Sequence, residues 1–263
     1  MLILSDLHLG HAASRIQSAE QLRPLLEGAG TVVFNGDTFQ ELASDFRPRS
    51  EVLMAELRSL CEELGTDPVF LSGNHDPGWE GQGWVELAGG KIIATHGDSV
   101  MWGGSPWSRE SVSRSRQLRE LWAEHPEAEH DPAVRLKMAR KMALLLRPPR
   151  IPKGRTILRR ALDAINPPRR AFEILRVWWQ QSGAAAEFLR HYFPQAEVLV
   201  VGHFHRRGLW FKSGRLVVNT GAFVHPHGSM WVSYENGWLR VGRVGENEGV
   251  FVRADPLTVW RFG

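Results

Sequence analysis

A chain of 263 residues, 43% of them hydrophobic and with a formal net charge of +3, is large enough for one domain, or one domain with an insertion, around a full core. Its single cysteine excludes a disulfide framework, no cationic and apolar signal sequence opens it, and no apolar run is long enough to span a bilayer. The sequence therefore predicts a cytoplasmic protein, with peripheral contact at the inner face of a membrane as a second expectation.

The first hundred residues alternate predicted strands with predicted helices. Four largely apolar runs predict buried strands, because each is too short to form a helix. Two longer segments carry apolar residues at helical spacing. The strands cover residues 1–5, 31–35, 68–72 and 91–95, and the helices cover residues 17–27 and 49–64. This alternation predicts an α/β sheet with its functional residues at the carboxyl edge.

Residues with metal-binding side chains follow each of these strands. A fifth predicted strand, residues 197–201, ends in two histidines that are separated by one residue. Carboxylates, amide oxygens and neutral imidazoles are hard or borderline metal ligands, so these five strand ends predict a metal site assembled from loops. The residues that follow the strands are Asp6, His8, Asp37, Asn74, His75, Asp76, His96, His203 and His205.

Two divalent cations suit this set, because one bridging carboxylate can hold a pair of them. Asp37 is the predicted bridge. Paired cations acidify water, align it with phosphorus and neutralise charge that develops on phosphoryl oxygens. We expect manganese, while iron, zinc and magnesium remain open. The first metal position would take Asp6, His8, Asp37 and His205, and the second metal position would take Asp37, Asn74, His96 and His203.

The segment after residue 196 predicts strands that are joined by short turns. It contains two hairpin signals, Lys212-Ser213-Gly214-Arg215 and Glu235-Asn236-Gly237-Trp238. These strands predict a second, largely antiparallel sheet that packs against the first. They cover residues 197–201, 209–212, 215–219, 230–234 and 238–244.

The segment of residues 105–195 interrupts this order of strands. Its apolar residues recur at helical spacing, and two Pro-Pro pairs divide it. It carries 18 Lys and Arg against 9 Asp and Glu, whereas the other residues carry 14 against 20. We expect a helical insertion that forms a lid over the site, within a single domain of residues 1–263. Its basic surface suits phosphates or anionic lipid, although each arginine taken singly fits a solvated helix as well.

Five motifs occur in order along the chain, each after a predicted strand. They are Asp6-x-His8, Gly36-Asp37, Gly73-Asn74-His75-Asp76, His96-Gly97 and Gly202-His203-x-His205. This set resembles the calcineurin-like metallophosphoesterase superfamily over residues 1–100 and 195–245. The resemblance implies an α/β fold, a four-layer α/β/β/α sandwich, and the ligand roles given above. It also implies a catalytic segment in which His75 lies outside the metal shell and donates a proton or a hydrogen bond to the leaving oxygen, while Asp76 orients its ring.

Within the superfamily, the chain resembles the UDP-2,3-diacylglucosamine pyrophosphatases of lipid A synthesis. The similar features are His96-Gly97-Asp98, the helical insertion, and Gly221-Ala222 before Gly228-Ser229-Met230. The resemblance implies a lid for acyl chains, for which arginines beside Phe172, Trp178 and Trp179 are suited. One motif differs, because those enzymes carry Arg where this chain has His75.

The expected function is that of a metal-dependent phosphoric ester hydrolase, acting as a phosphodiesterase or pyrophosphatase on a lipid-linked nucleotide such as UDP-2,3-diacylglucosamine. His11 and Arg206 are the expected contacts of the substrate phosphate. A nuclease that binds nucleic acid through the basic insertion is an alternative, as is a phosphodiesterase or phosphatase for small molecules. A non-enzymatic scaffold would lack Asp37, His75 or His203, and none of them is missing.

Overall fold

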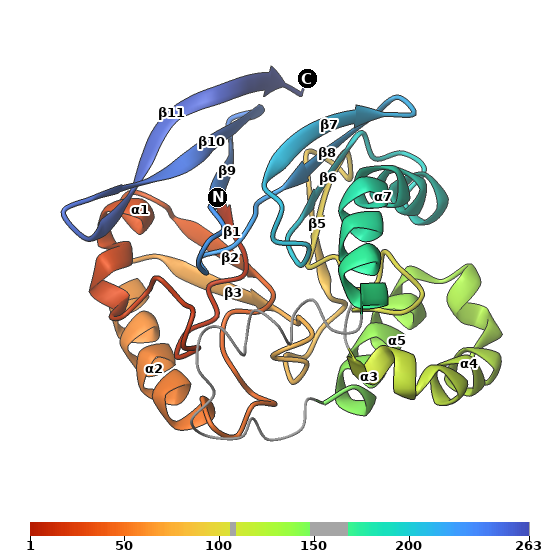
Figure 1. Cartoon of the computed structure of the whole chain (residues 1–263). Coiled ribbons are helices and arrows are strands. Elements are labelled where there is room, and N and C mark those ends of the chain that lie inside the picture. The colour runs from red at the N-terminus through yellow and green to blue at the C-terminus, as the bar shows by residue number, and fades with distance from the viewer. Residues whose placement is uncertain (106–108, 148–167, 263) are drawn as a thin grey trace.

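The computed structural model describes residues 1–105, 109–147 and 168–262. Its strands form two sheets that pack face to face (Figure 1). The six-stranded sheet has the order β11-β10-β9-β1-β2-β3, and the five-stranded sheet has the order β4-β5-β6-β8-β7. The strands are β1 (Leu2–Leu4), β2 (Thr31–Asn35), β3 (Asp67–Leu71), β4 (Trp84–Leu87), β5 (Ile92–Thr95), β6 (Val198–Val201), β7 (Gly208–Lys212), β8 (Arg215–Asn219), β9 (Met230–Glu235), β10 (Trp238–Asn247) and β11 (Val250–Arg261).

Helices cover the outer faces of both sheets. The helices α1 and α2 lie on the six-stranded sheet, and α7 lies on the five-stranded sheet (Figure 1). The predicted four-layer α/β/β/α architecture is therefore confirmed. The helices are α1 (Arg23–Leu26), α2 (Arg47–Glu63), α3 (Arg109–Ser113), α4 (Ser115–Ala123), α5 (Pro132–Leu145) and α7 (Pro168–Tyr192), with the 3-10 turns η1 (Ala19–Leu22) and η2 (Pro126–Glu129).

The alternation of side chains along β1 explains why its sequence is apolar throughout. Leu2 and Leu4 point into the core beneath α1 and α2, whereas Ile3 points into the core between the two sheets. Ile93 of β5 likewise faces a third core, which α7 closes from the outside with Val177. Each sheet is thus buried on both faces, which is the condition that favours near-continuous apolar strands.

The division of strands between the sheets differs from the prediction. β5 was expected in the first sheet but pairs with β6 in the second, and β9 and β10 were expected in the second sheet but extend the first from β1. The second sheet is mixed and not largely antiparallel, because β5 and β8 both run parallel to β6. The turn sequences predict which strands form hairpins. They do not predict which of the two sheets a hairpin belongs to. β4 and β11 were not predicted.

The helices α3, α4, α5 and α7 all come from the predicted insertion. Leu118 of α4 packs with Ala139 and Met142 of α5 in a small core of their own. The helix α7 forms the outer layer of the five-stranded sheet, so it belongs to the sandwich as well. Residues 148–167 of the insertion lie outside the described residues. Among the helices of the described part, none is long and apolar enough to cross a membrane.

Candidate metal centre

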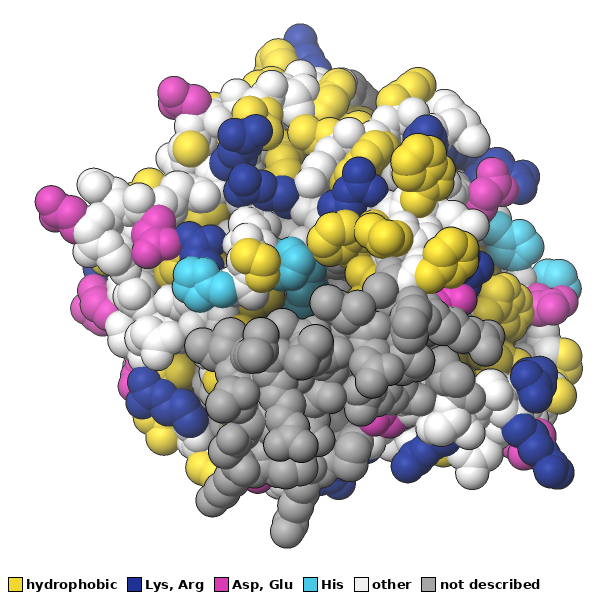
Figure 2. Space-filling model, in the orientation of Figure 1, with side chains coloured by type: hydrophobic (Ala, Val, Ile, Leu, Met, Phe, Trp, Pro, Cys, Tyr) yellow, Lys and Arg dark blue, Asp and Glu magenta, His cyan; other side chains and the backbone are white. Residues whose placement is uncertain are grey.

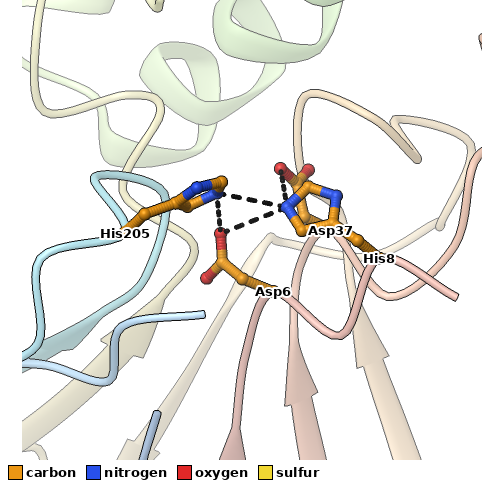
Figure 3. A group of neighbouring side chains, drawn as sticks. All are labelled: Asp6, His8, Asp37 and His205. Carbon is orange, nitrogen blue, oxygen red and sulfur yellow. Dashed lines mark hydrogen bonds and ion pairs between the residues drawn. The ribbon is translucent and has the colours of Figure 1, made fainter. Parts of the chain in front are cut away.

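The predicted ligands meet at the carboxyl ends of five strands that come from both sheets. Figure 3 shows four of these side chains pointing toward one another from their loops. The geometry follows from parallel strands, whose carboxyl ends share one edge of a sheet. The six-stranded sheet supplies Asp6, His8, Asp37 and Asn74 after β1, β2 and β3, and the five-stranded sheet supplies His96, His203 and His205 after β5 and β6.

Unusual backbone conformations hold these side chains in place. Asp6, His8, Asp37, His203 and His205 have φ angles between 47° and 63°, a left-handed region that non-glycine residues rarely adopt. They account for five of the nine non-glycine residues with positive φ in the described part of the chain. Backbone strain that clusters in this way is characteristic of functional sites.

The first metal position brings together Asp6, His8, Asp37 and His205, and one ligand atom of each lies within 4.8 Å of the others. The Nε2 atom of His205 lies 3.2 Å from Asp6 Oδ1 and 3.1 Å from His8 Nε2. Asp6 is fixed by the backbone N–H of His203, which donates to both carboxylate oxygens at 3.1 Å. Burial, and then the charge of His75, holds the pKa of His8 well below its ordinary value, so its ring is neutral.

The second metal position is centred on His96. Its Nε2 atom lies 3.4 Å from Asp37 Oδ1 and 3.3 Å from Asn74 Oδ1, while its Nδ1 atom lies 3.1 Å from the carbonyl oxygen of Asn35. His203 belongs to the same group. The Nε2 atom of His203 donates to the carbonyl oxygen of Gly104 at 3.2 Å, which directs Nδ1 to the cluster. Burial, assisted by the charge of His96, lowers the pKa of His203 to about 3.

Asp37 lies between the two groups. Its Oδ2 atom is 3.7 Å from His8 Nε2, and its Oδ1 atom is 3.4 Å from His96 Nε2 and accepts a hydrogen bond of 2.8 Å from the backbone N–H of His75. Burial raises the pKa of this carboxyl, but the charges of His96 and His75 lower it more, and the result is well below its ordinary value. Asp37 is therefore an anion with one oxygen turned to each metal position.

The chemistry of the donor atoms fits cations. Because His96 Nδ1 faces a carbonyl oxygen, it carries a hydrogen, and Nε2 faces two further acceptors, Asp37 Oδ1 and Asn74 Oδ1. Although burial lowers the pKa of His96, the charge of Asp37 raises it well above its ordinary value, so a proton occupies Nε2 when no metal ion is bound. A metal ion that displaces this proton would meet one lone pair from each of these three atoms. The site thus has affinity for positive charge where a metal ion would bind.

His75 lies beside these groups and outside both of them. Its Nε2 atom is 3.9 Å from Asp37 Oδ2, and its side chain is 33% exposed, so a substrate can reach it. Its Nδ1 atom lies 2.9 Å from Gln40 Oε1, and Gln40 Nε2 lies 2.9 Å from His8 Nδ1. The buried Gln40 side chain thus connects the candidate proton donor to a candidate ligand.

Asp76 does not contact the His75 ring, so the expectation that it orients this ring is wrong. Its carboxylate accepts hydrogen bonds from the backbone N–H groups of Asp37, Thr38, Phe39 and Gly73 and from the indole of Trp79. Burial, and then the charge of Asp37, raises the pKa of Asp76 to about 8, although the hydrogen-bond donors lower this pKa because they favour the ionised form. The residue ties the loop that carries Asp37 to the loop that carries Asn74 and His75.

The two expected phosphate contacts occupy different surroundings. The His11 ring centroid lies 6.1 Å from that of His8 and 4.7 Å from that of Phe46. The guanidinium of Arg206 donates to the carbonyl oxygen of Trp178 and lies 5.5 Å from the ring centroid of Trp210. Arg206 is therefore engaged by α7 and β7, and binding of phosphate by either residue stays a prediction.

Three residues that contact the candidate ligands were not predicted. The side chain of Gln40 and the carbonyl groups of Asn35 and Gly104 each contact a ring nitrogen of a ligand histidine. Gln40 follows Asp37 by three residues in the same loop, and this spacing was the one available signal. The sequence cannot show which backbone carbonyl groups contact a ligand, because every residue has one.

Comparisons with known proteins find one matching family model and several solved structures. The family model for calcineurin-like phosphoesterases matches residues 1–207. A dimetal phosphatase from Danio rerio is 13% identical with a TM-score of 0.47, over 100% of this chain and 99% of that one. Vacuolar protein sorting 29 from Cryptosporidium parvum is 12% identical with a TM-score of 0.45, over 99% and 97%. At these values, neither structure informs on substrate or mechanism. A search of curated proteins found no match.

Proposed function

Since the chain belongs to the calcineurin-like phosphoesterase family and is a metal-dependent phosphoric ester hydrolase, we propose that it uses two divalent cations, with manganese first among them, to cleave a phosphodiester or pyrophosphate bond. The observation that carries this proposal is the position of Asp37, whose two oxygens face two separate groups of ligand atoms. A pair of bound cations would acidify the attacking water and neutralise charge on the phosphoryl oxygens.

The side chains of the protein divide the remaining work. The carboxylates of Asp6 and Asp37 supply negative charge, while neutral imidazoles and the Asn74 oxygen complete the two metal positions. As water forms a bond to phosphorus, the bond to the leaving oxygen breaks, and that oxygen takes up a proton. His75 is the donor that we propose, because its ring is accessible and its Nε2 atom lies 3.9 Å from the bridging carboxylate.

A lipid-linked nucleotide such as UDP-2,3-diacylglucosamine is the leading substrate. Support comes from α7, on which Phe172, Leu175 and Trp179 are 64%, 64% and 85% exposed. Their spacing of three and four residues aligns them on one face of the helix. Hydrophobic and Lys or Arg side chains gather around exposed histidines on the face of the molecule in Figure 2. Such a surface suits acyl chains together with anionic groups, and peripheral contact with a membrane is part of the proposal.

Trp178 has a different role from the one expected in a lipid-facing lid. It is only partly exposed, and its indole N–H donates to the carbonyl oxygen of Phe204 at 3.1 Å. Its ring centroid lies 6.0 Å from that of His227, which in turn lies 5.3 Å from that of His205. Trp178 thus joins α7 to the loop of the candidate ligands, and this contact supports a lid that begins at the metal centre.

The proposal is tested by hydrolysis of three substrates in the presence of Mn²⁺. They are UDP-2,3-diacylglucosamine, bis-p-nitrophenyl phosphate and single-stranded DNA. We expect all cleavage to need Mn²⁺ and the lipid nucleotide to be preferred. Cleavage of the simple diester alone would retain the hydrolase and remove the lipid substrate, and preferred cleavage of DNA would indicate the nuclease. No Mn²⁺-dependent cleavage of any of them would count against the proposed bond specificity.

A matched pair of variants separates the lid from the chemistry. Replacement of both Phe172 and Trp179 with Ser removes exposed apolar area from α7 without touching a candidate ligand. We expect this double variant to lose activity on the lipid nucleotide and to keep activity on bis-p-nitrophenyl phosphate. Asp37→Asn serves as the inactive control. Equal losses on both substrates in the double variant would refute a role of this face in lipid recognition.

A further inference from the structure

The loop of residues 97–104 joins the candidate ligand His96 to the helical insertion. Its carbonyl group at Gly104 accepts the hydrogen bond from His203 Nε2, so this loop fixes the ring of a second candidate ligand. The loop consists of turns and bends and contains no helix or strand. Contacts with other elements must therefore hold it in position.

Two helices of the insertion hold the 97–104 loop by its carbonyl groups. From α5, Arg135 Nε donates to the carbonyl oxygen of Ser99 at 2.8 Å. From α4, Trp122 Nε1 donates to the carbonyl oxygen of Trp102 at 2.9 Å. Val100 of the loop packs into the core beneath α7. Three helices of the insertion therefore hold the loop in place.

Arg135 is the centre of this contact. It is 2% exposed, although burial of a guanidinium is costly unless its charge is compensated. Its Cζ atom lies 4.2 Å from the ring centroid of Trp102 and 4.5 Å from that of Trp122, and the two centroids lie 4.4 Å apart, so the cation packs against two aromatic rings that contact each other. The same side chain thus orders one tryptophan of the loop, one tryptophan of α4 and the carbonyl group of Ser99.

We propose that Arg135 is a positioning residue that acts through the 97–104 loop: it holds the Gly104 carbonyl group against His203 and so sets the ring orientation with which His203 meets the second metal position. Among the described residues, no hydrogen bond or ion pair joins this loop to His8 or His205, so the affinity of the first metal position should change little. The part of the proposal that concerns metal binding rests on the dinuclear centre proposed above.

The test uses the full chain with Arg135→Met, which keeps a long apolar side chain against the two rings and withdraws the donor and the charge. Lys141→Met is the matched control, because Lys141 lies on the same helix and its Nζ atom lies 2.7 Å from His125 Nε2, outside the loop. In metal-free protein labelled with ¹⁵N-histidine, the wild type and Lys141→Met should show an Nε2–H signal of His203 that is protected from exchange. Arg135→Met should lose this protection.

Titration with Mn²⁺ alone gives the second measurement. We expect Arg135→Met to bind the second ion roughly 10- to 100-fold more weakly and the first ion within about twofold of wild type, as is usual when a group that orients a metal ligand is lost. Unchanged protection and unchanged affinities would overturn the proposal. If Arg135→Met does not fold, Trp122→Phe removes the donor to Trp102 and keeps an aromatic ring beside Arg135. This variant should also bind the second ion more weakly, and wild-type affinity there would overturn the proposal.

The two proposals can fail separately. A wild-type chain that never binds a second Mn²⁺ would overturn the dinuclear function. The protected His203 signal is measured without metal, and it would still decide whether Arg135 positions that ring.

Discussion

Replacement of Gln40 with Met should disconnect His75 from His8. The Gln40 amide lies 2.9 Å from His8 Nδ1 and 2.9 Å from His75 Nδ1. In the structure, Gln40 Nε2 faces His8 Nδ1 and Gln40 Oε1 faces His75 Nδ1. A neutral His8 that offers Nε2 to a cation carries its hydrogen on Nδ1, so we expect binding of a cation to turn the amide over and bring its oxygen to His8. The amide nitrogen then donates to His75 Nδ1. Binding of a cation at the first metal position thereby puts the hydrogen of neutral His75 on Nε2, the atom proposed to serve the leaving oxygen.

The size of the effect follows from burial. His8 is 3% exposed and Gln40 is fully buried, so water does not replace the lost acceptor. A buried donor without a partner costs about 1–3 kcal/mol, which weakens binding at the first metal position roughly 5- to 150-fold. His96 and His203 do not contact Gln40 in the hydrogen bonds given above, and the second metal position should change far less. At saturating Mn²⁺, turnover should stay reduced, because the His75 tautomer is no longer fixed.

Titration of wild type and Gln40→Met with Mn²⁺ measures the two affinities, and ¹⁵N-histidine spectra report the tautomer of His75. Gln40→Glu is the control, because a carboxylate restores the acceptor for His8 and should restore the affinity of the first position. Affinities of Gln40→Met within twofold of wild type at both positions would show that the Gln40 contact with His8 has no role in metal binding.

Four further outcomes are expected. Asp37→Asn should lose both ions, whereas Asp6→Asn should lose one, by elemental analysis after dialysis; two ions retained by Asp37→Asn would exclude the bridge. His75→Ala should keep two ions and lower turnover roughly 10²–10⁴-fold, and loss of the ions would place His75 among the ligands. Gly36 has a φ angle of 79°, and the Cβ atom added by Gly36→Ala would lie 2.5 Å from the His96 ring. This variant should therefore lose more than about 1 kcal/mol of unfolding free energy and fail to bind the second ion. A wild-type melting temperature would contradict this. In metal-free protein, the pKa of His203 is about 3 in the folded chain and 6.5 in the unfolded chain. As the pH drops below 6.5, the unfolded chain therefore binds a proton that the folded chain does not bind, and the unfolding free energy falls. The difference in unfolding free energy between wild type and His203→Asn should therefore shrink by about 2 kcal/mol between pH 6.5 and pH 5 in urea titrations, and a constant difference would argue against a desolvated ring.

The strands were predictable because burial on both faces marks each of them locally. Ile92 to Thr95 and Val198 to Val201 are apolar or small at almost every position, and each is followed by a candidate ligand. The partner of a strand was not predictable by the same means. β9 pairs with β1 across more than two hundred residues, and nothing in Met230 to Glu235 distinguishes the edge of one buried sheet from the edge of the other. β11 was missed because Pro256 and its many exposed positions weaken the strand pattern.

The candidate ligands were predictable for a different reason, which is that ligand chemistry uses few residue types and each stands directly after a strand. The groups that orient them were not. Asp76 was expected at the His75 ring, yet five N–H donors from its own loop and from the loop after β2 surround its carboxyl group, and Gln40 contacts the ring instead. Such contacts depend on how two loops approach each other, and this approach is set by packing of the sheets and not by spacing in the sequence.

The two halves of the centre hold each other before any cation binds. The backbone N–H of His203, from the five-stranded sheet, donates to the carboxylate of Asp6, from the six-stranded sheet. Gly202 permits this approach, because a Cβ there would overlap Asp6 Oδ2. His96 reaches across in the same way toward Asp37. Folding therefore orders the donor atoms of both metal positions before cations bind. Because the ligand side chains have already lost their conformational entropy, binding does not cost it again. This favours tight binding and a fixed geometry for the reaction.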